Sequence, residues 1–146
     1  MLARITISLF LVAASSAAVF AHDGEDHGAQ SGQDHHQIVN FAGDSAPRIV
    51  ELKVEKDPVA GFNLFVVTEN FDFAPELVNT PHVDGKGHGH IYVDGVKVAR
   101  IYGPAFHLDG LDKGRRRIEV TLNANDHKQY AANGARISAE TSVEVP

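Results

Sequence analysis

Histidines carry most of the chemistry that this sequence could do. The chain has nine histidines and no cysteine, and its single methionine is the first residue. Four histidines lie in an acidic stretch rich in Gly and Gln, and five lie further along the chain: His22, His27, His35 and His36, then His82, His88, His90, His107 and His127. Closely spaced imidazoles beside carboxylates, without thiolates or thioethers, indicate a nitrogen and oxygen site for a borderline divalent metal. Copper(II) is the first candidate, and zinc(II) and nickel(II) follow, whereas the composition excludes a soft Cu(I) site.

The first 21 residues are typical of a secretory signal peptide. Arg4 precedes an apolar run over residues 5–12, and small residues follow as far as Ala21. The run is too short for a membrane span, and no second one follows, so we expect a periplasmic or secreted protein without a membrane span. Cleavage after Ala21 would place His22 at the N-terminus, where its amine and ring can bind copper together. Cleavage after Ala18 is the alternative and would remove that ligand.

The next segment, residues 22–39, has almost no apolar side chains and cannot build a core. We expect a disordered tail rich in His and Asp that attracts metal ions. A solvated linker whose histidines have no specific role is the open alternative. The formal net charge of −6 argues against nucleic acid and anionic membranes as partners and is compatible with cation binding.

Residues 40–146 form one domain in which apolar and polar residues alternate, the pattern of half-buried strands. The predicted strands are 50–54, 62–68, 88–93, 96–102, 106–108, 116–124 and 137–145. No segment has a sustained helical period. About seven short strands with regular turns predict an all-β fold, a single antiparallel β-sandwich of the immunoglobulin or fibronectin type.

Strand parity places the histidines. Asp94-Gly95 is a strong signal for a two-residue hairpin turn, across which Val93 would face Val96 and Ile91 would face Val98 in the core. His88 and His90 would then share the opposite, outward face, about 7 Å apart at Cα.

The predicted topology brings further histidines to the same rim. In a sandwich of this type the strands 88–93 and 116–124 are antiparallel neighbours, so His127 would lie beside the pair and His82 in the loop before it. We therefore expect His88, His90 and His127 to hold one ion, with His82 or His22 completing the shell.

A structural role for these histidines is the competing interpretation. His-x-His on a strand can be a polar face, Asn125-Asp126-His127 can be a simple turn, and His107 is expected to be structural. Gly87 and Gly89 favour the site, because glycine within a strand usually marks a close approach or an unusual backbone.

The stretch Gly-His-Gly-His-Ile-Tyr-Val-Asp-Gly, with Leu-Asn-Ala-Asn-Asp-His further on, resembles small secreted bacterial domains of the immunoglobulin-like type. That likeness covers about residues 62–145. In general plan the chain is also similar to periplasmic copper-binding β-sandwiches of the copper-resistance type, which bind copper through an N-terminal His with further His and Asp ligands. It departs from them in its strand motifs and in lacking a Met-rich loop.

These features predict a protein that binds, delivers or buffers a divalent metal and is not an enzyme. Its partners would be the ion and a metal transporter or a recipient metalloenzyme. Two alternatives stay open: an accessory interaction module with incidental histidines, and a small copper-dependent oxidative enzyme that uses His22.

Overall fold

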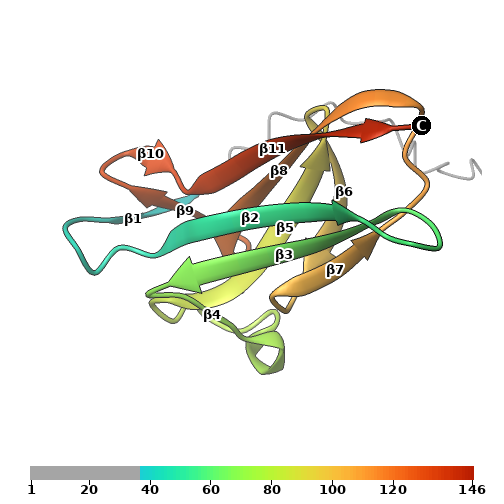
Figure 1. The fold of residues 1–146 in the computed structure, drawn as a ribbon. Helices are drawn as coiled ribbons and strands as arrows, with labels where there is room; N and C mark the ends of the chain where they lie inside the picture. Colours follow the sequence, from blue (N-terminus) through green and yellow to red (C-terminus); the bar gives the residue numbers. More distant parts are fainter. Residues whose placement is uncertain (1–36) are drawn as a thin grey trace, which may run out of the picture. The chain divides into compact units, whose positions relative to one another are not determined.

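Residues 37–146, the part of the chain that the computed structural model describes, fold almost wholly into β-strands (Figure 1). The predicted signal peptide, most of the tail and His22 lie outside the described residues. The strands are β1 (Ile38–Phe41), β2 (Arg48–Lys56), β3 (Phe62–Glu69), β4 (Asp72–Phe73), β5 (Lys86–Val93), β6 (Val96–Ile101), β7 (Ala105–Leu108), β8 (Gly114–Ala124), β9 (Gln129–Ala132), β10 (Ala135–Arg136) and β11 (Ser138–Val145). A single turn of 3₁₀ helix, η1 (Pro75–Leu77), follows β4. Over the described range no helix is long and apolar enough to cross a membrane.

The all-β prediction is confirmed. Each of the seven predicted segments coincides with a strand, namely β2, β3, β5, β6, β7, β8 and β11. The sequence did not predict β1, β4, β9 and β10, which have only two to four residues each. β4 and β10 have two residues each, too few to show a period of two.

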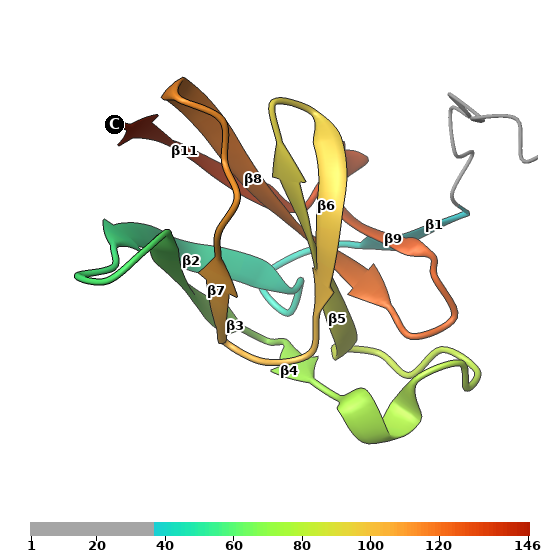
Figure 2. The same cartoon turned by 90° about the vertical axis from the view of Figure 1, so that its right-hand side faces the viewer.

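The strands form two sheets that lie face to face (Figures 1 and 2). The larger sheet has the order β1-β9-β8-β5-β4, with β10 on β9, β11 on β8 and β6 on β5, and the smaller has the order β2-β3-β7. β5 and β8 are antiparallel neighbours, as predicted. This pairing sets Asn123 beside His88 and Thr121 beside His90.

Apolar side chains from both sheets fill the space between them. Leu64, Ile91, Ile118 and Val120 have no exposed surface at the centre of this core. A second cluster surrounds Tyr130, whose ring meets Phe41 and Phe71 edge to face at 5.0 and 6.0 Å between centroids. This cluster holds β1, β4 and β9 around the end of β8, where the Asn125-Asp126-His127 turn begins.

The β5–β6 hairpin differs from the prediction by one residue. The Asp94-Gly95 turn forms with both residues at positive φ, 50° and 86°, and Val93 pairs with Val96 as expected. A bulge then shifts the register, so that Ile91 pairs with Ala99 and not with Val98, which is 48% exposed. A one-residue shift exchanges the two faces of a strand. The prediction that Val98 faces the core is therefore wrong.

Gly87 lies where the backbones of β5 and β8 approach closely. A Cβ at this position would stand 2.0 Å from the backbone oxygen of Asn123, well inside van der Waals contact. The glycine before His88 therefore marks a close backbone approach, one of the two roles that its place in a strand predicts. It allows His88 to lie directly beside β8.

Candidate metal centre

His88 and His90 form a close imidazole pair on the face of β5 that points away from the apolar core between the two sheets. Their Nε2 atoms are 3.0 Å apart and their ring centroids 4.8 Å apart. The predicted face is correct, because Ile91 between His90 and Tyr92 points into the core. The two rings are nevertheless buried, at 0% and 1% exposure, and do not lie on a solvated surface as expected.

The bulge in the hairpin brings two further side chains to this pair. Because β6 is shifted by one residue, Arg100 pairs with His90. The Tyr102 ring, just beyond the strand, lies 5.4 Å from the His88 ring between centroids. Arg100 Nη1 donates a hydrogen bond of 3.2 Å to the Tyr102 hydroxyl. Sequence reasoning missed both residues because it assumed an unbroken hairpin register.

His127 also reaches the pair, as the predicted topology requires. Its ring lies 5.8 Å from that of His88 between centroids, and it sits in the turn after β8 with φ of 70°. Its Nε2 is 3.2 Å from the side-chain oxygen of Asn79, in the segment that follows η1. His127 is thus beside His88 but directed toward a different partner.

Asn125 touches the pair from the same turn. Its side-chain oxygen lies 3.4 Å from His88 Nδ1, on the ring edge opposite the contact with His90. A simple turn was one of the two interpretations of the Asn125-Asp126-His127 motif, and neither gave Asn125 a contact with a histidine ring.

Burial is the main cause that holds the pKa of His88 down to about 4, compared with 6.5 for a free histidine. The positive charge of Arg100 lowers the pKa further, and His127 and Lys97 act in the same direction, whereas the hydrogen bond with Asn125 opposes the shift. A buried imidazole is costly to charge. At neutral pH His88 therefore carries no charge and keeps one ring nitrogen with a lone pair, the form that binds metals.

His82, the other predicted ligand among the described residues, and His107, which was expected to be structural, both lie elsewhere. His82 makes a 2.6 Å contact with Asp84 and packs against the Tyr130 ring, in contacts separate from those of His88 and His90. His107 is exposed on β7 of the other sheet and lies 3.1 Å from Asn63. Within residues 37–146 no three His, Asp or Glu side chains are arranged to hold one metal ion. The described part of the chain offers a two-histidine centre with a third histidine nearby.

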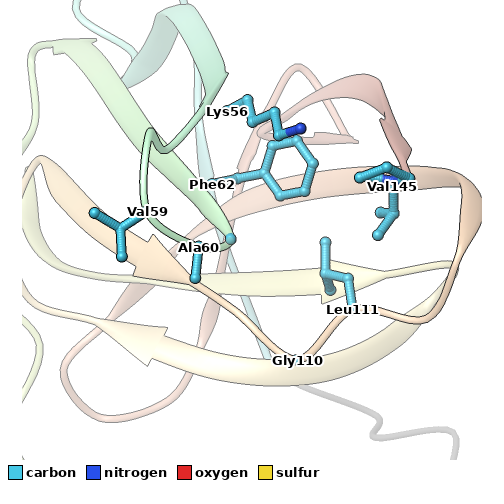
Figure 3. A pocket seen from close by; sticks show the side chains of 9 residues that line it. Lys56, Val59, Ala60, Phe62, Gly110, Leu111 and Val145 are labelled. Carbon is cyan, nitrogen blue, oxygen red and sulfur yellow. The ribbon is translucent and has the colours of Figure 1, made fainter.

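A hollow of about 300 Å³ lies apart from the histidines, where β2, β3 and β11 end or begin (Figure 3). Its walls are mainly apolar and include Phe62, Leu111 and Val145, with Lys56 beside the Phe62 ring. It brings together no pair of groups suited to acid–base chemistry or metal ligation. The histidine pair is therefore the stronger candidate site.

Comparisons with known proteins add no family. No family model matches the chain, and neither a curated protein nor a solved structure matches it. The function must accordingly be argued from the geometry of the site.

Proposed function

We propose that this protein binds a divalent metal ion, copper(II) in the first place, through the Nε2 atoms of His88 and His90. Zinc(II) and nickel(II) are the other candidates. The observation that carries the proposal is the 3.0 Å separation of the two Nε2 atoms, with His88 held neutral in a buried position. Neutral imidazole nitrogens that converge on one point are the ligands that these metals prefer.

The separation of the two nitrogens favours some metals over others. An ion bound to both at the usual distance of about 2.0–2.1 Å would make an N–metal–N angle of roughly 95°. That angle is near the right angle between neighbouring ligands in the square-planar or tetragonal sites of Cu(II) and Ni(II). A tetrahedral zinc site needs about 3.3–3.4 Å between the nitrogens, so zinc would require the rings to move apart.

Further ligands would come from His127 and from the tail. His127 is the third histidine at the centre, and it would bind by exchanging its contact with Asn79 for the ion. The tail joins the fold at β1, three strands away from β5. Ile38 pairs with Gln129, Gln129 with Asn123, and Asn123 with His88, so about 14 Å separates Ile38 from His88 at Cα.

Histidines of residues 22–36 would be tethered ligands in this proposal. A tethered ligand acts at a high effective concentration without any new affinity of its own. His22, at a free N-terminus, is the tail ligand with the strongest chelating chemistry, whereas His82 would have to leave Asp84 to take part.

The proposed setting is the periplasm or the extracellular medium, where the protein would bind, deliver or buffer the metal. The supporting features are the signal-peptide pattern of residues 1–21 and the arrangement of two sheets around one core, which we assign to the immunoglobulin type. A metal transporter or a recipient metalloenzyme would be its partner. The resemblance to copper-resistance β-sandwiches accords with this role.

Copper(II) titration of the His88→Ala/His90→Ala double variant tests the proposal. We expect affinity to fall at least tenfold, about 1.4 kcal/mol, because both proposed ligands are removed. His107→Ala is the matched control, since this histidine is exposed on the other sheet and should leave affinity unchanged.

Both rings are buried, so circular dichroism must show that the double variant is folded. If it is not, His90→Gln keeps a polar group of similar size and should still weaken binding. Unchanged copper affinity in a folded variant contradicts the proposal, as does the absence of copper binding by the wild-type protein.

A second candidate function is an interaction module, and β6 is the observation that favours it. β6 pairs only with β5 and leaves its other edge without a strand in the described fold (Figure 2). Val96 and Val98 on this strand are 66% and 48% exposed. Exposed edge strands are templates for pairing with other chains, although the charges of Lys97 and Arg100 also protect against it. Protein isolated without metal and unresponsive to added copper would favour this function.

A further inference from the structure

We propose that Asn125 is a positioning residue that holds His88 in the tautomer with its proton on Nδ1. In that tautomer Nε2 of His88 carries a lone pair that points at His90. The inference deepens the proposed metal binding and rests on it for its purpose, but the tautomer itself can be measured without any metal. It assigns the Asn-Asp-His turn a role beyond reversing the chain.

The first step is the orientation of the Asn125 amide. Asn125 is 2% exposed, and its side-chain nitrogen donates a hydrogen bond of 3.0 Å to the backbone oxygen of Ala74. The reversed amide would set two oxygen atoms against each other at that distance. The amide oxygen must therefore point the other way, toward His88 Nδ1 at 3.4 Å.

The second step follows from what that oxygen can do. A carbonyl oxygen only accepts hydrogen bonds, and a buried polar group without its partner costs free energy. In mildly alkaline solution, well above the usual histidine pKa of about 6.5, the His88 ring is neutral and has one proton to place. A proton on Nδ1 satisfies the Asn125 oxygen, whereas a proton on Nε2 would leave two lone pairs facing each other across the Asn125 contact.

The third step concerns the contact between the two histidines. Two Nε2 atoms at 3.0 Å need one proton between them. The ring proton of His88 is on Nδ1, where it is donated to the Asn125 oxygen. The proton in this contact therefore belongs to His90, whose Nε2 donates to the lone pair on His88. For a metal to bind, His88 would need no proton shift, and the single ring proton of His90 would move from Nε2 to Nδ1, which keeps that ring neutral.

The backbone holds Asn125 in place for this role. Asn125 follows β8 directly, and its carbonyl oxygen accepts a hydrogen bond of 3.2 Å from the Asn79 amide. Ala74 and Asn79 lie on either side of η1, and both are hydrogen-bonded to Asn125. Asn125 therefore connects the η1 segment to His88. Partners of this kind, behind the ligands themselves, typically change metal affinity by about 10- to 100-fold when they are removed.

Nitrogen-15 NMR of the metal-free protein in mildly alkaline buffer tests the assignment, because a protonated and an unprotonated ring nitrogen have widely separated shifts. We expect the proton of His88 on Nδ1 in the wild-type protein. A predominant Nε2–H tautomer of His88 in the wild-type protein overturns the inference, and this measurement needs no variant to fold.

Two variants separate positioning from a merely structural role. Asn125→Leu and Asn125→Asp both lose the hydrogen bond to Ala74, but only Asn125→Asp keeps an acceptor for His88. We expect the Nδ1–H tautomer to persist in Asn125→Asp and to be lost or mixed with the other tautomer in Asn125→Leu. An unchanged tautomer in a folded Asn125→Leu protein overturns the inference.

Copper binding gives a second readout. Asn125→Leu should bind copper(II) about tenfold or more weakly, with the larger part of that loss recovered in Asn125→Asp. Equal loss in both variants would show that the bond to Ala74 is what matters and would overturn the positioning role. If the wild-type protein binds no copper, the proposed function fails, and the NMR result alone then decides the tautomer.

Discussion

Acidification of the metal-free protein should destabilise it through His88 in particular. The pKa of this ring is about 4 in the folded chain, mainly because the ring is buried, compared with 6.5 for the free side chain. Between these two values the unfolded chain takes up a proton that the folded chain does not. Stability therefore falls as the pH drops through this window, and above about pH 6.5 His88 contributes no pH dependence.

The two pKa values set the size of the effect. Each pH unit inside the window is worth about 1.4 kcal/mol, so the loss at about pH 5 should be near 2 kcal/mol. Over the whole window the ceiling is roughly 3 kcal/mol. Salt screens the part that comes from Arg100 and Lys97, so high ionic strength should reduce the loss.

Urea unfolding with a chelator present, followed from about pH 7.5 to about pH 5, measures this loss. His88→Gln is the comparison, since glutamine does not titrate while the other ionisable groups are common to both proteins. We expect the wild-type protein to lose about 2 kcal/mol more than the variant over this range. Parallel pH profiles of the two proteins would refute the reasoning and would mean that His88 is as easily charged in the fold as outside it.

Two further predictions concern the strand and the tail. Gly87→Ala should lower the free energy of unfolding by about 1–3 kcal/mol or more, because the added Cβ would meet the Asn123 backbone oxygen at 2.0 Å. Gly103→Ala is the control: its Cβ would have open space, so it should be neutral or slightly stabilising. Chemical denaturation measures both. A Gly87→Ala protein as stable as the Gly103→Ala control would show that β5 and β8 separate at little cost. Deletion of residues 23–36 should reduce the number of copper ions bound per chain, yet leave the affinity of the tightest site and the melting temperature nearly unchanged. Gln37 must be kept in this deletion, because its carbonyl oxygen accepts a hydrogen bond within the fold. Loss of the tightest site on this deletion, measured by calorimetric titration, would move the principal ligands to the tail.

Alternation of apolar residues was sufficient to predict the long strands and the face of the histidines. Ile118, Val120 and Leu122 point into the interior with no exposed surface, as their period of two requires. The same parity sets His88 and His90 on the opposite face from Ile91. These predictions succeed because successive side chains of a strand point to its two opposite faces, so the apolar residues that enter the core fix the face of all the others.

The hairpin register shows where parity alone fails. An unbroken register from the Asp94-Gly95 turn would put Val98 in the core and would bury Arg100 beside it. The sequence does contain a sign of the bulge, because the apolar positions change parity between Val98 and Ala99, and Ile101 follows on the new parity. The bulge inserts one residue into β6, so that Ile101 enters the core and the Arg100 side chain points to the opposite face.

The burial of the histidine pair could not be predicted, because parity tells which face a side chain shares but not what covers that face. Asn125 and Tyr102 reach His88 from a turn and from the residue after a strand, and Asn79 reaches His127 from an irregular loop. These segments have no regular period. Their contacts depend on how η1 docks against the turn after β8, which is a tertiary event. The same contacts decide whether the His88 ring is charged and which of its two nitrogens is unprotonated. The chemistry of the centre is therefore set less by the His-x-His spacing, which only brings the rings together, than by the residues that enclose it.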